Sequence, residues 1–211
     1  MGTTSAESKR NKTIRRIFTA AAKVFSESGF AGARMDEIAK RARVNKATIY
    51  YHIGDKKALY AEVLHTIIGE ATEQFMDDLQ GNESPEKRLK VYIGGVIHTM
   101  NRNPYLAPIM LREQASGGRN LPEVIAGDFA RIISVLTEIL EEGEKQGVFI
   151  KTTSFIIHSL FIGGLMFYQS SYPVRSRYSN FLPEPVKKLG ADLTDEIARE
   201  IENLILKAVK K

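Results

Sequence analysis

The chain has 211 residues, of which 43% are hydrophobic, and this composition excludes a disordered protein. It contains no cysteine, which excludes disulfides, thiolate metal sites and a cysteine nucleophile and fits a reducing cytoplasm. The formal net charge of +5 is uneven, because residues 1–56 carry twelve Lys or Arg against five Asp or Glu and the remainder is slightly acidic.

A basic end joined to a slightly acidic body is typical of a nucleic-acid-binding module attached to another domain. The longest apolar stretch, residues 155–168, is shorter than the ~20 residues that span a bilayer, so we expect no membrane partner. The first residues have no apolar segment that would form a secretory signal. We therefore expect a cytoplasmic protein whose residues 1–11 form a mobile arm.

Helical periodicity dominates the chain and predicts an all-α fold of about nine helices. The first helix is predicted over residues 12–28, with Gly29 placed to end it in the left-handed conformation. A second follows over residues 34–42, and a short third helix over residues 46–52 begins after Asn45, a good N-cap. This spacing is that of a helix, a tight turn and a second helix.

A long fourth helix begins after Asp55 and ends near residue 80, and it connects the N-terminal part to the body. Apolar stripes, glycines and prolines predict the later helices around residues 89–102, 105–114, 122–146, 152–171 and 194–210. Residues 172–190 contain three prolines without a helical period and are predicted to form a loop. The domains expected from this reading are residues 12–56 for DNA binding and 57–211 for ligand binding and dimerisation.

Two lysines occupy unusual positions in these predicted helices. Lys46 and Lys56 each fall in the first turn of a helix, where the positive end of the helix dipole disfavours cations by about 0.3–1 kcal/mol. A phosphate from outside would satisfy both the lysine and the free backbone N–H groups. The alternative is that these are ordinary solvated lysines whose long side chains swing away from the helix end.

The segment from Gly29 to Leu64 resembles the N-terminal domain of the TetR family of bacterial transcriptional regulators. The matching pieces are Gly29-Phe30, residues 36–39, Val44, residues 48–52, and Lys56 followed by Leu59. The body resembles the family only in helix number, length and the glycine pair at 163–164. The resemblance implies a helix-turn-helix DNA-binding domain, a homodimer and a body cavity whose small-molecule ligand releases a repressor from a palindromic operator.

The resemblance also implies which residues meet DNA. The third helix enters the major groove, with Lys46 and Ala47 near base edges and Tyr50 as a further base contact, and these side-chain types can read guanine and thymine. Phosphate contacts fall to Thr48, Tyr51, His52 and Lys56.

Two positions depart from the family pattern. Arg34 stands where a hydroxyl residue often caps the second helix, so that cap is lost and a cation is available for DNA. Arg43 stands where glycine is common in the turn, and it must adopt either a less favoured backbone conformation or a slightly different turn. We include both arginines among the candidate DNA contacts.

The candidate ligand-binding residues are aromatic, histidine and methionine side chains on the body helices: Tyr92, His98, Met110, Phe129, His158 and Tyr168. His158 lies in an apolar helix and needs a polar partner, either a neighbouring side chain or a ligand. Glu62 and His65 form the only spacing suited to a metal, and no second such pair is present, so we expect no metal, cofactor or catalytic residue.

Homodimerisation is expected through the last two predicted helices, because the eighth is apolar all round and the ninth carries one apolar stripe. The candidate interface residues are Phe161, Gly163, Gly164, Ile197, Ile201, Leu204 and Ile205. The alternative is that both helices pack inside one monomer. Two other functions stay open: an all-α enzyme, either a hydrolase or a metal oxidase, and a DNA-binding module regulated by a protein partner.

Overall fold

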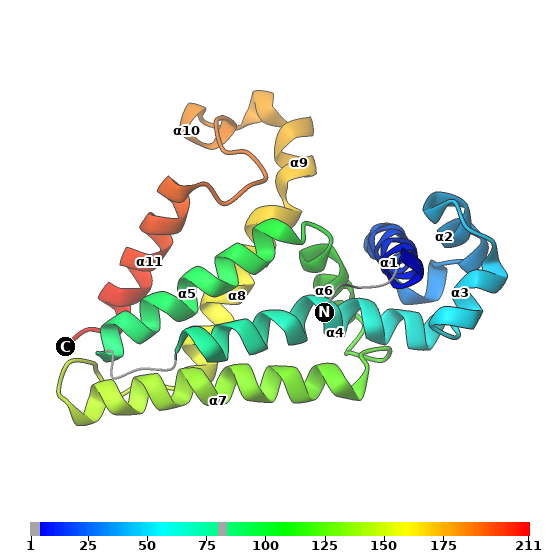
Figure 1. Cartoon of the computed structure of the whole chain (residues 1–211). Coiled ribbons are helices and arrows are strands. Elements are labelled where there is room, and N and C mark those ends of the chain that lie inside the picture. Colours follow the sequence, from blue (N-terminus) through cyan, green and yellow to red (C-terminus); the bar gives the residue numbers. More distant parts are fainter. Residues whose placement is uncertain (1–4, 80–83) are drawn as a thin grey trace.

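The computed structural model describes residues 5–79 and 84–211, and these are all-helical as the sequence predicts (Figure 1). They contain eleven α-helices and one 3-10 helix, rather than about nine helices, and no strand; one isolated antiparallel bridge joins Phe149 and Lys210. The helices are α1 Ser5–Gly32, α2 Met35–Ala42, α3 Lys46–His52, α4 Lys56–Asp78, α5 Pro85–Arg102, α6 Leu106–Ala115, α7 Glu123–Lys145, α8 Ser154–Ser170, α9 Tyr172–Arg177, α10 Glu184–Lys187 and α11 Asp195–Val209.

The first helix differs from its predicted bounds at both ends. It begins at Ser5, so residues 5–11 are helical and do not form an arm; residues 1–4 lie outside the described residues. At the other end Gly29 has φ 65° and ψ 176°, which interrupts the helix at the predicted glycine before one more turn reaches Gly32. Glycine allows this positive φ without the steric cost of a Cβ.

The predicted loop at residues 172–190 is wrong in detail, because it contains α9, the 3-10 helix Ser179–Phe181 and α10. Pro173 and Pro185 sit in the first turns of α9 and α10, where the missing N–H has no intrahelical partner to lose, and Pro183 is the N-cap residue of α10. These helices have only six and four residues, too few for the apolar periodicity that identifies a helix in a sequence. In Figure 1 the segment projects away from the long helices of the body.

The buried side chains form two clusters. The first joins α1, α2 and α3 to the beginning of α4, through Ile17, Phe25, Ile38, Ile49 and Leu59, and it continues into α6 and α7. The second lies between α5, α7, α8 and α11. Since α4 belongs to the first cluster and also runs along α5 and α7, a displacement within the body can reach α1–α3, which we call the head.

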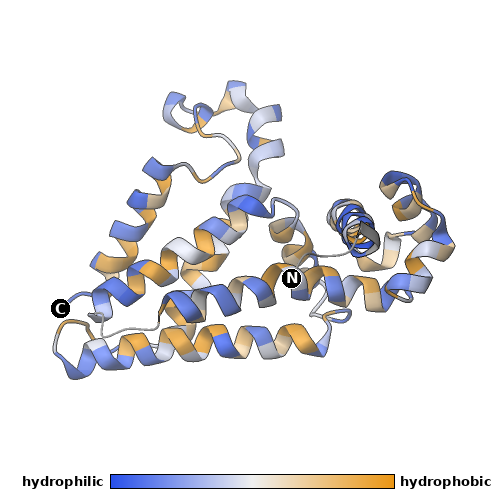
Figure 2. Cartoon of the chain, viewed as in Figure 1, coloured by the Kyte–Doolittle hydropathy of each residue, from blue (hydrophilic) through white to orange (hydrophobic). Residues whose placement is uncertain are grey.

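Apolar colouring in Figure 2 follows the inward stripes of α4, α5 and α7, as expected for amphipathic helices around a core. Helix α8 departs from that pattern, because it presents large apolar side chains to solvent. The exposed fractions are 65% for Phe155, 53% for Ile156, 68% for Leu160 and 71% for Phe167. No helix of the described residues is both long and apolar enough to cross a membrane.

Candidate nucleic-acid interface and ligand cavity

The short helix α3 is held at both ends by local hydrogen bonds. The side chain of Asn45 accepts a hydrogen bond of 2.9 Å from the backbone N–H of Ala47, as expected for an N-cap. Ile49 is fully buried and anchors the helix to the head. The opposite face is presented to solvent, with Ala47 exposed, Tyr50 48% exposed and Tyr51 85% exposed. A short helix with such a face can enter a groove of a duplex.

The turn before α3 is closed by backbone hydrogen bonds. Arg43 adopts φ 54° and ψ 48°, the one left-handed non-glycine residue among those described, which is one of the two alternatives expected for its place in the turn. The N–H groups of Arg43 and Val44 donate to the carbonyls of Lys40 and Ala39 at 3.1 and 3.0 Å. Arg16 of α1 donates to the carbonyls of Ala42 and Arg43, so α1 also fixes this turn.

Arg34 and Arg43 leave their guanidinium groups exposed at the two ends of α2. Arg34 has extended backbone angles and makes no side-chain cap, so the expected loss of the cap is confirmed. Neither side chain forms an ion pair within the described residues. Together with Thr48 and His52, which are half-buried, and the two tyrosines, they remain proposed DNA contacts.

The two lysines at helix N-termini already have partners inside the chain. Lys46 forms an ion pair of 3.0 Å with Asp36 of α2. Lys56 is more fully engaged, because its ammonium group donates to the carbonyls of Phe30 at 2.9 Å and Ala33 at 3.1 Å and lies 4.6 Å from the ring centroid of Phe30. In this structure Lys56 therefore stabilises the end of α1, and its contact with a DNA phosphate stays a prediction.

Replacing Lys56 with alanine is expected to lower the free energy of unfolding by about 1–2 kcal/mol, because it removes charge-assisted hydrogen bonds to backbone carbonyls. Urea denaturation measures the change, and Lys57→Ala, at the exposed neighbouring position, is the matched control. A Lys56→Ala protein that unfolds like the wild type but binds every duplex more weakly would instead support the predicted contact of Lys56 with a phosphate.

The body contains an apolar cavity of about 470 Å³ lined by residues of α4 to α8. Tyr92, Met110, Phe129 and His158, four of the six predicted ligand residues, line it. The volume lies within the range of ~300–1,000 Å³ that is usual for small-molecule sites. Sequence reasoning missed the polar lining residues Thr99, Gln114 and Ser159, because they lie on helices whose apolar stripes gave the stronger signal.

Within this cavity Tyr92 Oη and His158 Nδ1 are 2.7 Å apart, so the buried histidine has the neighbouring partner that its apolar helix demanded. Burial lowers the pKa of His158 and raises the pKa of Tyr92, which keeps both groups neutral. The pair therefore presents a neutral polar edge in an otherwise apolar wall.

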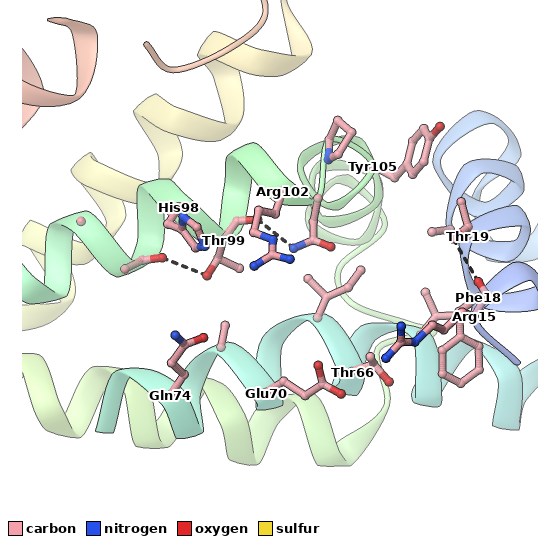
Figure 3. Close-up of a pocket in the computed structure, with 18 of the residues that line it drawn as sticks. Arg15, Phe18, Thr19, Thr66, Glu70, Gln74, His98, Thr99, Arg102 and Tyr105 are labelled. Atoms are coloured by element: carbon pink, nitrogen blue, oxygen red, sulfur yellow. Dashed lines mark hydrogen bonds between the residues drawn. The ribbon is translucent and has the colours of Figure 1, made fainter. Parts of the chain in front are cut away.

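The other two predicted ligand residues do not line this cavity. The guanidinium of Arg175 lies over the ring of Tyr168, 4.9 Å from the ring centroid. His98 lines a separate polar cleft of about 810 Å³ between α1, α4 and α5. Figure 3 shows this cleft, with Arg15 of α1 and Arg102 of α5 projecting into it.

Helix α6 links the apolar cavity to the head. Met110, Leu111 and Gln114 line the cavity. Between them Arg112 donates to the carbonyls of Ser26 and Glu27 at the end of α1, at 3.1 and 2.9 Å. Glu113, 4% exposed, accepts a hydrogen bond of 2.9 Å from Tyr60 of α4. A shift of α6 would therefore reach two helices of the DNA-facing end at once.

The candidate interface residues fall into two groups. Gly164 is exposed on α8, and Leu204 of α11 is 58% exposed, whereas Gly163 lines the apolar cavity. Ile197, Ile201 and Ile205 are half-buried against the second core cluster. Phe161 is 3% exposed and lies 6.3 Å from the ring centroid of Tyr92, so it belongs to the core of its own chain and we remove it from the proposed interface.

A histidine and a buried carboxylate join α4 to α7. His65 Nδ1 is 2.9 Å from Asp128, which raises the pKa of His65. Asp128 is 4% exposed, so its carboxyl group depends on this partner. His65, the histidine of the Glu62 and His65 spacing, therefore has a structural partner in Asp128. No group of three or more His, Cys, Asp or Glu suited to a metal occurs among the described residues.

Comparisons with known proteins agree with the geometry. Residues 17–63 match the family model of bacterial regulatory proteins of the tetR family. The transcriptional repressor NicS of Pseudomonas putida is 29% identical over 216 residues, covering 95% of this chain and 94% of that protein. The hemolysin II transcriptional regulator HlyIIR is 28% identical with a TM-score of 0.63, covering 96% of this chain and 99% of that one. The regulator FadR from Bacillus subtilis in complex with stearoyl-CoA has the same fold, with a TM-score of 0.65, 18% identity and coverage of 91% and 97%.

Proposed function

We infer that this chain is a regulator of the TetR family of bacterial transcriptional regulators, and that it is a DNA-binding repressor whose body binds a small molecule that releases it from its operator. The observation that carries this inference is the pairing of a helix-turn-helix head, with the exposed face of α3, and an apolar cavity in the body. The relatives are regulators, and we assign no catalytic role to the cavity. We propose that the protein acts in the bacterial cytoplasm, where its DNA lies.

We propose that two copies bind a palindromic duplex through α3. Ala47, Tyr50 and Lys46 are the candidates for base contacts, and Arg34, Arg43, Thr48, Tyr51 and His52 for phosphate contacts. Lys46 can exchange its ion pair with Asp36 for a base, because the pair is exposed and such pairs contribute about 0–1 kcal/mol. The duplex would then meet a surface whose turn geometry is already fixed.

We propose that the ligand acts through α6. A molecule that fills the apolar cavity contacts Met110, Leu111 and Gln114, and the adjacent residues Arg112 and Glu113 hold α1 and α4. A shift of α6 would move those two contacts and so change the separation of the two heads. Only a ligand that binds the displaced arrangement more tightly can drive this change.

The test is an electrophoretic mobility shift with the upstream region of the protein's own gene, over a series of salt concentrations. We expect retardation that weakens steeply as salt rises, because phosphate contacts release counterions. Absence of any retardation at low salt would contradict DNA binding at this site and leave the cavity without a regulatory role.

Two substitutions separate base reading from phosphate binding. Lys46→Ala is expected to change the relative affinities of operator variants, by about 1–3 kcal/mol at the base pair that it reads. Arg34→Gln is expected to weaken all duplexes alike, because a phosphate contact carries no sequence information. Binding to a panel of singly substituted operators measures both; a uniform loss with Lys46→Ala would remove its base-reading role.

A further inference from the structure

The apolar cavity and the polar cleft adjoin each other in the middle of the body. Both are lined by Ala71 of α4 and by Gly95 and Thr99 of α5. The residues that the two spaces share are therefore an alanine, a glycine and a threonine, all with small side chains. Small side chains at this boundary favour a molecule that occupies both spaces.

The two spaces have opposite chemical character. The apolar cavity, of about 470 Å³, is lined mostly by aliphatic and aromatic side chains and holds no Asp, Glu, Lys or Arg. The polar cleft, of about 810 Å³, contains Arg15, Arg102, Glu70 and Asp78 together with several hydroxyl and amide groups. A ligand that satisfied both would be apolar at one end and polar at the other.

Two arginines of the cleft can bind an anion near the head. Arg15 and Arg102 project into it from α1 and α5 (Figure 3), and neither forms an ion pair within the described residues. Glu70 projects from α4 between them, and Asp78 also lines the cleft, so an anion there would be bound by the two guanidinium groups and not by an excess of positive charge. Two guanidinium groups present ten N–H donors in planar forks that suit carboxylate and phosphate oxygens.

We propose that the effector of this protein is an amphiphile, with an apolar chain in the apolar cavity and an anionic head group, a carboxylate or a phosphate, in the polar cleft between Arg15 and Arg102. The inference rests on the proposed function, because it names the chemical class of the ligand that releases the repressor. It extends the ligand site beyond the apolar cavity to the junction between body and head.

This placement gives the ligand a direct contact with the head. Arg15 belongs to α1, and the next residue, Arg16, donates to the carbonyls of Ala42 and Arg43 in the turn before α3. An anion bound by Arg15 and Arg102 would tie α1 to α5 and fix the head relative to the body. An uncharged ligand of the same length lacks this contact and acts through α6 alone.

The experiment compares decanoate, decyl phosphate and 1-decanol, which share one chain and differ in the head group. Each displaces the uncharged dye Nile red from the purified full-length protein, and the concentration for half displacement is measured. At least one of the two anions should bind about fivefold more tightly than the alcohol, and which anion does so identifies the head group. In Arg102→Gln this preference should fall to about one while 1-decanol affinity stays unchanged.

Arg131→Gln, an exposed arginine of α7 outside both spaces, is the matched control and should keep the preference. Arg102 lies in the last turn of α5, so a purely structural role at that helix end would lower the melting temperature and weaken all three probes equally. Equal affinities for anions and alcohol in the wild type, or an unchanged preference in Arg102→Gln, would overturn the inference. If that protein still binds its operator and Nile red, the proposed function stands; failure of operator binding is a separate result.

Discussion

Exchange of Leu160 and Phe167 for aspartate is expected to leave the protein monomeric and to weaken operator binding by about a hundredfold or more. These side chains are 68% and 71% exposed and lie with Ile156 along one side of α8. A contiguous apolar face of this kind marks an interaction surface. Gly164, which is exposed on the same side of the helix and has no side chain, would let a second helix approach closely. Two charges at the centre of such an interface cannot be buried without partners.

Size-exclusion chromatography with light scattering measures the oligomeric state, and a shift assay measures operator affinity. Val124→Asp adds the same charge at an exposed apolar position of α7, away from α8, and is expected to keep the dimer. The affinity falls because a palindrome then has to recruit two independent heads. A double variant that remains dimeric would place the interface elsewhere, with α11 and its exposed Leu204 as the next surface to test.

Replacement of Glu113 by alanine is expected to lower the free energy of unfolding by about 3 kcal/mol. The carboxyl group is buried and accepts hydrogen bonds from Tyr60, from Ser116 and from the backbone N–H of Asn120, at 2.9, 3.4 and 3.3 Å. Burial and this carboxylate raise the pKa of Tyr60, so its hydroxyl stays protonated and would be left without an acceptor. Urea denaturation at neutral pH measures the loss.

The conservative variant Glu113→Gln keeps an acceptor for Tyr60 and should recover about half of the lost stability. Glu138→Ala removes an exposed carboxylate of α7 and should change stability by less than about 0.5 kcal/mol. If α6 carries the ligand signal, Glu113→Gln should also require more ligand for release of the operator. Wild-type stability in Glu113→Ala would mean that water replaces the carboxyl group without cost.

Features set by neighbouring residues could be predicted from the sequence. Asn45 caps α3, Ile49 anchors it and Gly29 interrupts α1, and each depends on periodicity or on local backbone conformation. The family resemblance, which rests on the same segment, is confirmed by the match over residues 17–63 and by the repressor NicS, which aligns with 95% of the chain. The left-handed backbone of Arg43 is one of the two alternatives that its place in the turn allowed.

Features set by distant contacts could not be predicted. Lys56 is separated by 26 residues from the Phe30 carbonyl that it binds, so its helix position alone suggested a missing anion. His98 and Tyr92 share α5 but face different spaces, since only the packing of α1 and α4 decides where a cleft forms. Helix α8 reads as uniformly apolar, and the sequence cannot tell which side meets the core and which side stays open.

The internal bonds of the head limit how strongly salt can control its affinity for DNA. Arg16 and Lys56 donate to backbone carbonyls, and Arg41 is paired with Glu27 and Glu37. A cation releases counterions from a duplex only if it meets a phosphate, and each such contact adds about 0.9 to the slope of log affinity against log salt. The slope of log affinity against log salt should therefore be smaller than a count of the lysines and arginines implies. The difference corresponds to up to about three phosphate contacts for each head.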